Sequence, residues 1–148
     1  MRYNVEHGIV IRSENAAKPD VQCSAYLKDM LLNLPLVSST LNFGCGKLRY
    51  HDAILSKTDD LILVDSEVQL SRTQIILDRM TSIREAVGGL NHVQALNVAE
   101  LERHPARFDR AFCINVLSVI PIEAVRQRVV RLIRAKLKPG GSALFVVQ

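Results

Sequence analysis

Two glycines one residue apart, Gly44 and Gly46, lie where a short apolar run meets a segment with helical spacing. A strand, a glycine turn and a helix in this order bring backbone N–H groups and the positive end of a helix close to a ligand. Glycine suits the turn because a side chain would block the approach. Asp65 follows about 20 residues later, the spacing at which a carboxylate accepts hydrogen bonds from a ribose. The alternative for Asp65 is a structural role as the N-cap of a helix.

Short apolar runs alternate with segments of helical spacing from residue 36 onward. The runs cover residues 41–43, 61–64, 93–96, 111–114 and 143–147, and the segments between them predict helices at 47–57, 68–87 and 122–137. Apolar runs without alternation are typical of strands buried on both faces. Strands and helices in alternation predict an α/β fold with a parallel sheet and right-handed crossovers.

The first 35 residues read as an N-terminal arm and a helix, followed by a domain at 36–148. Residues 1–18 are mostly polar, with Ile9-Val10-Ile11 as a short extended piece and His7-Gly8 as a turn. Pro19-Asp20 is expected to open a helix. Its apolar face recurs at three- and four-residue spacing, at Cys23, Leu27, Met30, Leu31 and Leu34. No linker separates the two parts, so we expect one structural domain overall.

Composition places the chain among ordinary globular proteins. Of its 148 residues, 48% are apolar and 23% charged, and no apolar run reaches the length of a membrane span. The N-terminus lacks the apolar core of a signal peptide, and three isolated cysteines predict neither disulfides nor a zinc site, so we expect a cytoplasmic protein. The net charge of +4 is compatible with a nucleic-acid partner without favouring one.

Three candidate site segments follow predicted strands, where ligands bind in parallel sheets. They are Gly44-Cys45-Gly46, Asp65-Ser66 and Asn97-Val98. A dinucleotide fingerprint would need a third glycine at Arg49, and a triphosphate loop would need Gly-Lys-Ser/Thr. The sequence has neither, which makes NAD, FAD and nucleoside triphosphates the weaker choices.

The motifs resemble those of class I S-adenosylmethionine-dependent methyltransferases, in particular small bacterial methyltransferase domains. The resemblance runs from about residue 36 to the end, through Leu41 to Gly46, Val64-Asp65, Phe108-Asp109, Ile114 to Leu117 and Leu137 to Gly141. It implies a Rossmann-like parallel sheet in the order 3-2-1-4-5 with helices on both faces. That sheet is a truncated form of the family's fold, because the last two of the usual seven strands have no counterpart here.

The resemblance implies S-adenosyl-L-methionine as cofactor and assigns positions around it. Gly44, Cys45 and Gly46 would approach its methionine part, and Asn42 stands where the family has an acid that helps to hold the ammonium group. The remaining implied contacts are Asp65 and Ser66 at the ribose, Asn97 and Val98 at the adenine, and Asn115 at the methyl donor. Leu48 replaces the family's third glycine.

Methyl transfer depends mainly on positioning, and a base is needed only if the acceptor must lose a proton. No catalytic base stands out, since His51 is a lone helix histidine of the kind that is usually exposed. Asn115-Val116-Leu117-Ser118 replaces the Asn/Asp-Pro-Pro-aromatic motif of amino-methylating DNA enzymes, and the Pro-Cys nucleophile of cytosine methylation is missing. We predict a methyltransferase whose acceptor, small molecule or macromolecule, is unknown. The alternative is a non-catalytic cofactor-binding or partner-binding subunit or fragment.

The fifth predicted strand, 143–147, is apolar and would form an edge of the sheet. An apolar edge strand exposes unpaired N–H and C=O groups. We therefore expect either that the sequence is a piece of a longer protein or that a partner chain or second copy covers this strand. The N-terminal arm is a less favoured cover, because it would first have to cross the sheet.

Overall fold

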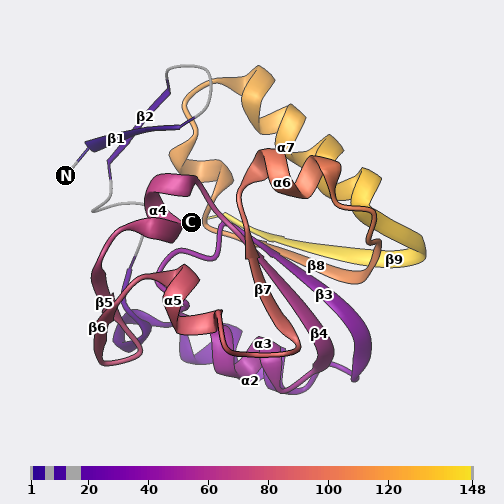
Figure 1. Cartoon of the computed structure of the whole chain (residues 1–148). Helices are drawn as coiled ribbons and strands as arrows, with labels where there is room; N and C mark the ends of the chain where they lie inside the picture. Colours follow the sequence, from indigo (N-terminus) through magenta and orange to yellow (C-terminus); the bar gives the residue numbers. More distant parts are fainter. Residues whose placement is uncertain (1, 6–8, 13–17, 148) are drawn as a thin grey trace.

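A parallel five-stranded sheet forms the centre of the structure, a computed structural model that describes residues 2–5, 9–12 and 18–147 (Figure 1). The strands in sheet order are β7 (Val93–Leu96), β4 (Thr58–Val64), β3 (Val37–Phe43), β8 (Phe108–Ile114) and β9 (Leu137–Val146). All four pairings are parallel. If the five strands of this sheet are numbered 1 to 5 along the chain, their order is 3-2-1-4-5, as predicted.

Helices cover both faces of the sheet (Figure 1). One face carries α2 (Ala25–Leu32), α3 (His51–Leu55) and α5 (Ile83–Val87). The other carries α6 (Val98–Arg103) and α7 (Glu123–Lys136). The remaining elements are 3₁₀ turns η2 (Asp20–Gln22) and η3 (Leu117–Val119), helix α4 (Glu67–Ser71), hairpin strands β1 (Arg2–Val5) and β2 (Ile9–Arg12), and hairpin strands β5 (Gln74–Ile76) and β6 (Arg79–Thr81).

The two apolar layers explain the strand sequences. In β4, Leu61 and Leu63 join the layer under α2, α3 and α5, whereas Ile62 and Val64 join the layer under α6 and α7. Successive side chains point to opposite faces, so a strand buried on both needs apolar residues throughout. In β9 the same alternation holds from Ala143 to Val146, where the side chains are only partly buried. Among the described residues β9 pairs with β8 alone.

The predicted helix at 68–87 is wrong. The structure has helix α4, the β5–β6 hairpin and helix α5 there instead. The hairpin turns at Leu77 and Asp78, whose φ angles are 48° and 65°. Such turns favour Asn-Gly or Asp-Gly, and Leu77-Asp78 has no glycine, so the turn signal in the sequence was weak.

Several element boundaries also differ from prediction. The helix expected from Pro19 begins only at Ala25, where Ser24 caps α2 by accepting a hydrogen bond from the Leu27 N–H at 3.3 Å. The expected apolar face is confirmed, because Leu27 and Leu31 are buried in the core. Helix α3 is shorter than the predicted 47–57.

The C-terminal half holds two further differences. Residues 137–141, which lie before the fifth predicted strand, belong to β9, with an irregular register between the pairs of Phe108 and Arg110. Helix α6 was not predicted, although Asn97 and Glu100 form its capping box. In the N-terminal arm, strands β1 and β2 pair antiparallel, and the predicted His7-Gly8 turn lies outside the described residues. Within the described ranges no helix has the length and apolar character needed to cross a bilayer.

Candidate functional site

The glycine loop after β3 is fastened to the end of β4. The N–H groups of Gly44 and Cys45 donate to the Val64 carbonyl oxygen at 2.7 and 3.0 Å. The next N–H, of Gly46, donates to Asp65 Oδ2 at 2.9 Å. All three donors are used inside the protein, which differs from the expectation that they would face a ligand.

Backbone conformation explains why the loop needs glycine. Gly44 and Gly46 have φ angles of 77° and 56°, in the left-handed region. A Cβ on Gly44 would also overlap Val116 Cγ2. Leu48, in place of the family's third glycine, has the same left-handed conformation with φ 63°. That strain costs on the order of 1–3 kcal/mol, and burial of the leucine, which is 1% exposed, offsets it by about 1.5–3 kcal/mol.

Asp65 joins the glycine loop to the start of α4. Its Oδ1 accepts the Ser66 N–H at 2.8 Å, while Oδ2 holds the Gly46 N–H. Burial raises the pKa of Asp65, and the two backbone hydrogen bonds act in the opposite direction. The N-cap of α4 is Ser66, which accepts from the Gln69 N–H at 3.3 Å. Each carboxylate oxygen can accept a second hydrogen bond, so Asp65 fits a pair of ribose hydroxyls.

Gln69 connects the glycine loop to the β5–β6 hairpin, a role that the sequence did not indicate. Its side chain is fully buried, and Nε2 donates to the Gly46 carbonyl oxygen at 2.8 Å. Gln74, in β5, donates back to the Gln69 carbonyl oxygen at 3.1 Å. The β5–β6 hairpin therefore supports the glycine loop through Gln69.

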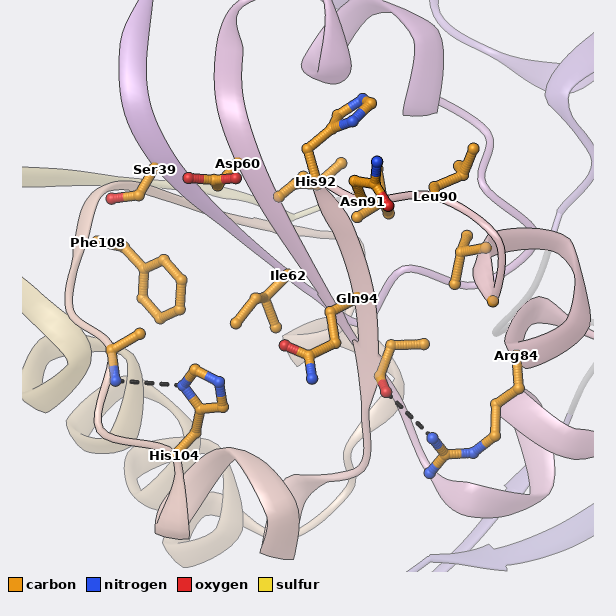
Figure 2. A pocket seen from close by; sticks show the side chains of 16 residues that line it. Ser39, Asp60, Ile62, Arg84, Leu90, Asn91, His92, Gln94, His104 and Phe108 are labelled. Atoms are coloured by element: carbon orange, nitrogen blue, oxygen red, sulfur yellow. Dashed lines mark hydrogen bonds between the residues drawn. The ribbon is translucent and has the colours of Figure 1, made fainter.

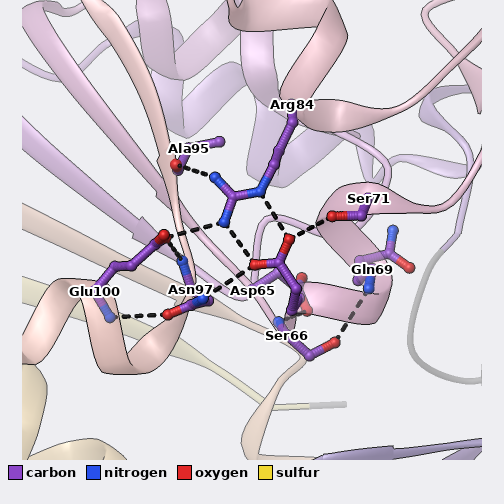
Figure 3. Close-up of polar contacts among 9 residues, drawn as sticks. Asp65, Ser66, Gln69, Ser71, Arg84, Ala95, Asn97 and Glu100 are labelled. Carbon is purple, nitrogen blue, oxygen red and sulfur yellow. Dashed lines mark hydrogen bonds and ion pairs between the residues drawn. The ribbon is translucent and has the colours of Figure 1, made fainter.

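Asn97 lies in a polar network at the carboxyl ends of β4 and β7 (Figure 3). Its Oδ1 accepts the Glu100 N–H at 2.8 Å, and its Nδ2 donates to Glu67 at 3.0 Å. Arg84 binds Glu67 at 2.6 Å, Glu100 at 3.0 Å and the Ala95 carbonyl oxygen at 3.1 Å. The network joins α4, α5 and α6, so the side chain of Asn97 already has structural partners beside the expected adenine position.

This network predicts a loss of stability in acid. Hydrogen bonds from Arg84, Ser71 and Asn97 lower the pKa of Glu67 from 4.5 to about 2. Because the folded pKa lies below the ordinary value, Glu67 stabilises the fold above about pH 4.5 and loses that effect as the pH falls toward 2. The side chain is half exposed, so solvent screening limits the gain to about 1 kcal/mol.

Melting curves between pH 2.5 and 6 measure this effect. We expect Glu67→Gln to lower Tm by about 2–4 °C near neutral pH, and this difference to shrink steadily below pH 4.5 to roughly a quarter of that value near pH 2.5. Glu102→Gln is the matched control, since the Glu102–Arg128 pair is exposed and long, at 3.4 Å. A Tm difference for Glu67→Gln that stays constant across this range would contradict the assignment.

Asn42 and Asn115 lie at the ends of neighbouring strands. Asn42 is 6% exposed, in register between Leu63 of β4 and Phe112 of β8. Asn115 follows β8 with φ 58°, and its N–H donates to the Val146 carbonyl oxygen at 2.8 Å. Asn42 lines a small cavity of about 30 Å³ together with the glycine loop.

The predicted site residues therefore lie at the carboxyl ends of the strands. Hydrogen bonds directly join Gly46 to Asp65 and Asp65 to Ser66, and Asn115 is joined through its neighbour Val116, which packs against Gly44. Asn97 is connected through its hydrogen bond to Glu67 and through its neighbour Leu96, whose carbonyl oxygen accepts the Asp65 N–H at 3.4 Å. The side chain of Val98 is turned to the apolar layer under α6 and α7.

Two residues near the loop are poor candidates for chemistry. Burial raises the pKa of Cys45 well above its ordinary value, which leaves the thiol protonated and unreactive. His51 is 5% exposed, contrary to the expectation of an exposed histidine, and burial lowers its pKa. It does not line the glycine-loop cavity. The described part of the chain contains no cluster of three potential metal ligands.

A larger cavity, of about 660 Å³, lies elsewhere (Figure 2). It runs beside the edge strand β7, at the N-terminal halves of the strands, with Asp60, Gln94 and His104 among its polar residues. Ligands of parallel sheets bind at the opposite, carboxyl end. We therefore place the candidate site at the glycine loop, in spite of the smaller cavity there.

Solved structures share this fold. N-methyltransferase NodS from Bradyrhizobium japonicum WM9, in complex with S-adenosyl-L-homocysteine, matches 89% of the chain over 68% of its own length, with a TM-score of 0.63 and 15% identity. CalS10, an amino pentose methyltransferase from Micromonospora echinaspora with bound S-adenosylmethionine, has a TM-score of 0.59 and 16% identity. The match covers 87% of the present chain and 53% of CalS10. The [4+2]-cyclase SpnF has a TM-score of 0.57 and 21% identity, and the match covers 88% of the present chain and 49% of SpnF.

The sheet order, the glycine loop and these neighbours define a class I S-adenosylmethionine-dependent methyltransferase fold. No family model matches the sequence. The chain is 38% identical over 149 residues to YmfD of Escherichia coli (strain K12), described as uncharacterized, and spans 67% of that protein. It belongs to the same family as YmfD.

Proposed function

We propose that the chain is an S-adenosylmethionine-dependent methyltransferase. The observation that carries the proposal is the joint between the glycine loop and Asp65, in which the Gly46 N–H donates to the carboxylate at the carboxyl edge of β3 and β4. This joint places a left-handed glycine backbone beside a carboxylate with spare acceptor capacity. A nucleoside linked to an amino acid needs both features next to each other.

In this proposal the residues bind and orient. Asp65 accepts hydrogen bonds from the ribose hydroxyls, with Ser66 beside it. Gly44, Cys45 and Gly46 border the methionine part, and the segments at Asn97-Val98 and Asn115 border the adenine and the reacting methyl group. S-adenosylmethionine supplies an electrophilic methyl group on a sulfonium. Alignment of an acceptor with that group is the main contribution that the protein makes to such a displacement.

The acceptor is not assigned by this proposal. Burial raises the pKa of Cys45, which keeps the thiol protonated, and His51 is buried outside the lining of the glycine-loop cavity. Three cysteines without a disulfide are compatible with the cytoplasmic location expected from the sequence, which stays part of the proposal.

Thermal-shift measurements test the cofactor. We expect S-adenosylhomocysteine at about one hundred times its Kd to raise Tm by roughly 5–10 °C, because ligand binding at that excess contributes about 2.7 kcal/mol. NAD and ATP at the same concentration serve as controls and should leave Tm unchanged. An equal or larger shift with NAD would contradict the proposal.

A second candidate is a cofactor-binding protein that does not transfer methyl groups. SpnF supports it, because that protein is a [4+2]-cyclase on the same fold. Fold alone does not fix the reaction. Turnover with a candidate acceptor separates the two functions, whereas both predict binding of S-adenosylhomocysteine.

A further inference from the structure

We propose that the glycine-loop pocket holds the amino-acid end of its ligand through the carboxylate, by Lys18, Lys47 and Arg49, and makes little use of the ammonium group. The inference rests on the proposed function. It concerns which of the two charges of a zwitterionic ligand the pocket recognises.

The first observation is that the loop backbone has few donors left for a carboxylate. The N–H groups of Gly44 and Cys45 share the Val64 carbonyl oxygen, and that of Gly46 binds Asp65. The Leu48 N–H donates to the Cys45 carbonyl oxygen at 3.0 Å. A carboxylate that enters this pocket must therefore find most of its partners among side chains.

The second observation is the charge of the pocket. Its lining includes three cations, Lys18, Lys47 and Arg49, and no carboxylate among the described residues. None of the three forms an ion pair with a carboxylate in the described ranges. Asp65 is the neighbouring acid, but it does not line this pocket, and the proposed function assigns its remaining acceptor capacity to the ribose.

Contacts with Gln22 and Tyr50 hold the Arg49 side chain in place. Its Nη1 donates to the Gln22 carbonyl oxygen at 3.0 Å, and its guanidinium lies 5.2 Å from the centre of the Tyr50 ring. The Tyr50 hydroxyl in turn accepts the Ser24 N–H at 2.9 Å. These contacts hold the segment before α2 against the glycine loop, which brings Lys18 into the lining of the same pocket.

The third observation is that the pocket has an uncharged residue, Asn42, at the position where the family has an acid. Asn42 is buried and lines the pocket where a carboxylate would otherwise attract an ammonium group. An amide oxygen can accept a hydrogen bond from an ammonium group, but the interaction lacks the attraction of a full ion pair. With three cations nearby, a positively charged group gains little there.

Calorimetry with three ligands tests the inference on the whole chain. The ligands are S-adenosylhomocysteine, its deaminated analogue, which keeps the carboxylate, and its decarboxylated analogue, which keeps the amine. We expect the deaminated analogue to bind within about threefold of S-adenosylhomocysteine, and the decarboxylated one at least about thirtyfold more weakly, as loss of hydrogen bonds between charged groups suggests.

Variants locate the effect. Lys18→Met and Lys47→Met should each weaken S-adenosylhomocysteine about three- to tenfold and leave the decarboxylated analogue unchanged, which a double-mutant cycle measures. Lys28→Met, on the exposed side of α2, is the matched control for loss of one positive charge and should change neither ligand. Asn42→Asp should tighten S-adenosylhomocysteine, which carries the amine, but not the deaminated analogue.

Two outcomes overturn the inference separately from the proposed function. If S-adenosylhomocysteine binds but the deaminated analogue loses tenfold or more, or if the decarboxylated analogue binds as well as the parent, the ammonium group matters and the carboxylate assignment is wrong. If S-adenosylhomocysteine itself does not bind, the proposed function fails and the inference with it.

Discussion

Asp65→Ala is expected to weaken the binding of S-adenosylhomocysteine about tenfold or more. The substitution removes an acceptor of ribose hydrogen bonds and also the partner of the Gly46 N–H, so the glycine loop loses one of its attachments. A hydrogen bond to a charged group contributes about 1.5–3 kcal/mol, which corresponds to roughly 10- to 150-fold in affinity.

Two variants separate the ribose contact from a general disturbance. Asp65→Asn keeps the size of the side chain and one acceptor, so we expect an intermediate loss. Asp59→Ala removes an exposed carboxylate of β4 and should bind as the wild type does. Equal affinity of the wild type and Asp65→Ala in calorimetry, with unchanged circular dichroism, would remove the ribose role.

Gly44→Ala is expected to lower the stability of the fold strongly. An L-residue at φ 77° is strained, and the added Cβ would overlap Val116 Cγ2. Together the backbone strain and the overpacking cost roughly 2–5 kcal/mol, equivalent to a fall in Tm of about 5–15 °C. Differential scanning calorimetry measures the loss.

A second substitution distinguishes the two causes. Val116→Ala in the Gly44→Ala background should recover the part due to overlap and leave the part due to backbone strain. Gly89→Ala is the matched control, because a Cβ there meets nothing within 4 Å, and we expect a change within about 0.5 kcal/mol. A Tm for Gly44→Ala equal to that of Gly89→Ala would show that the loop tolerates a side chain.

The sheet could be predicted because its information is local. Each strand needs apolar residues on both faces, and continuous apolar runs such as 61–64 and 143–147 predict such strands without knowledge of the rest of the fold. The segment after Asp65 could not be predicted in the same way. Ile76, Ile83 and Val87 are all buried, and their spacing of seven and four residues is compatible with one long helix. The turn at Leu77 and Asp78, which follows Ile76, lacks the glycine that usually marks such a turn.

The candidate site divides along the same line. Gly44, Gly46 and Asp65 could be predicted because fixed spacing places them at adjacent strand ends. The network of Glu67 and Arg84 and the loop support from Gln69 depend on side chains that meet only after folding. For these residues the sequence holds no signal. Helix α6 is different, since its capping box at Asn97 and Glu100 was readable and was missed.

The central position of β3 also bears on the order in which the molecule assembles. Thr40 pairs with Leu61 of β4 and with Arg110 of β8, so one neighbour is about 20 residues away and the other about 70. Each doubling of loop length adds about 0.6 kcal/mol to the entropy cost of closure, and distant pairings slow folding. We therefore expect β3 and β4 to associate first. The glycine loop and Asp65 would then meet before β8 brings Asn115 to the opposite side of the site.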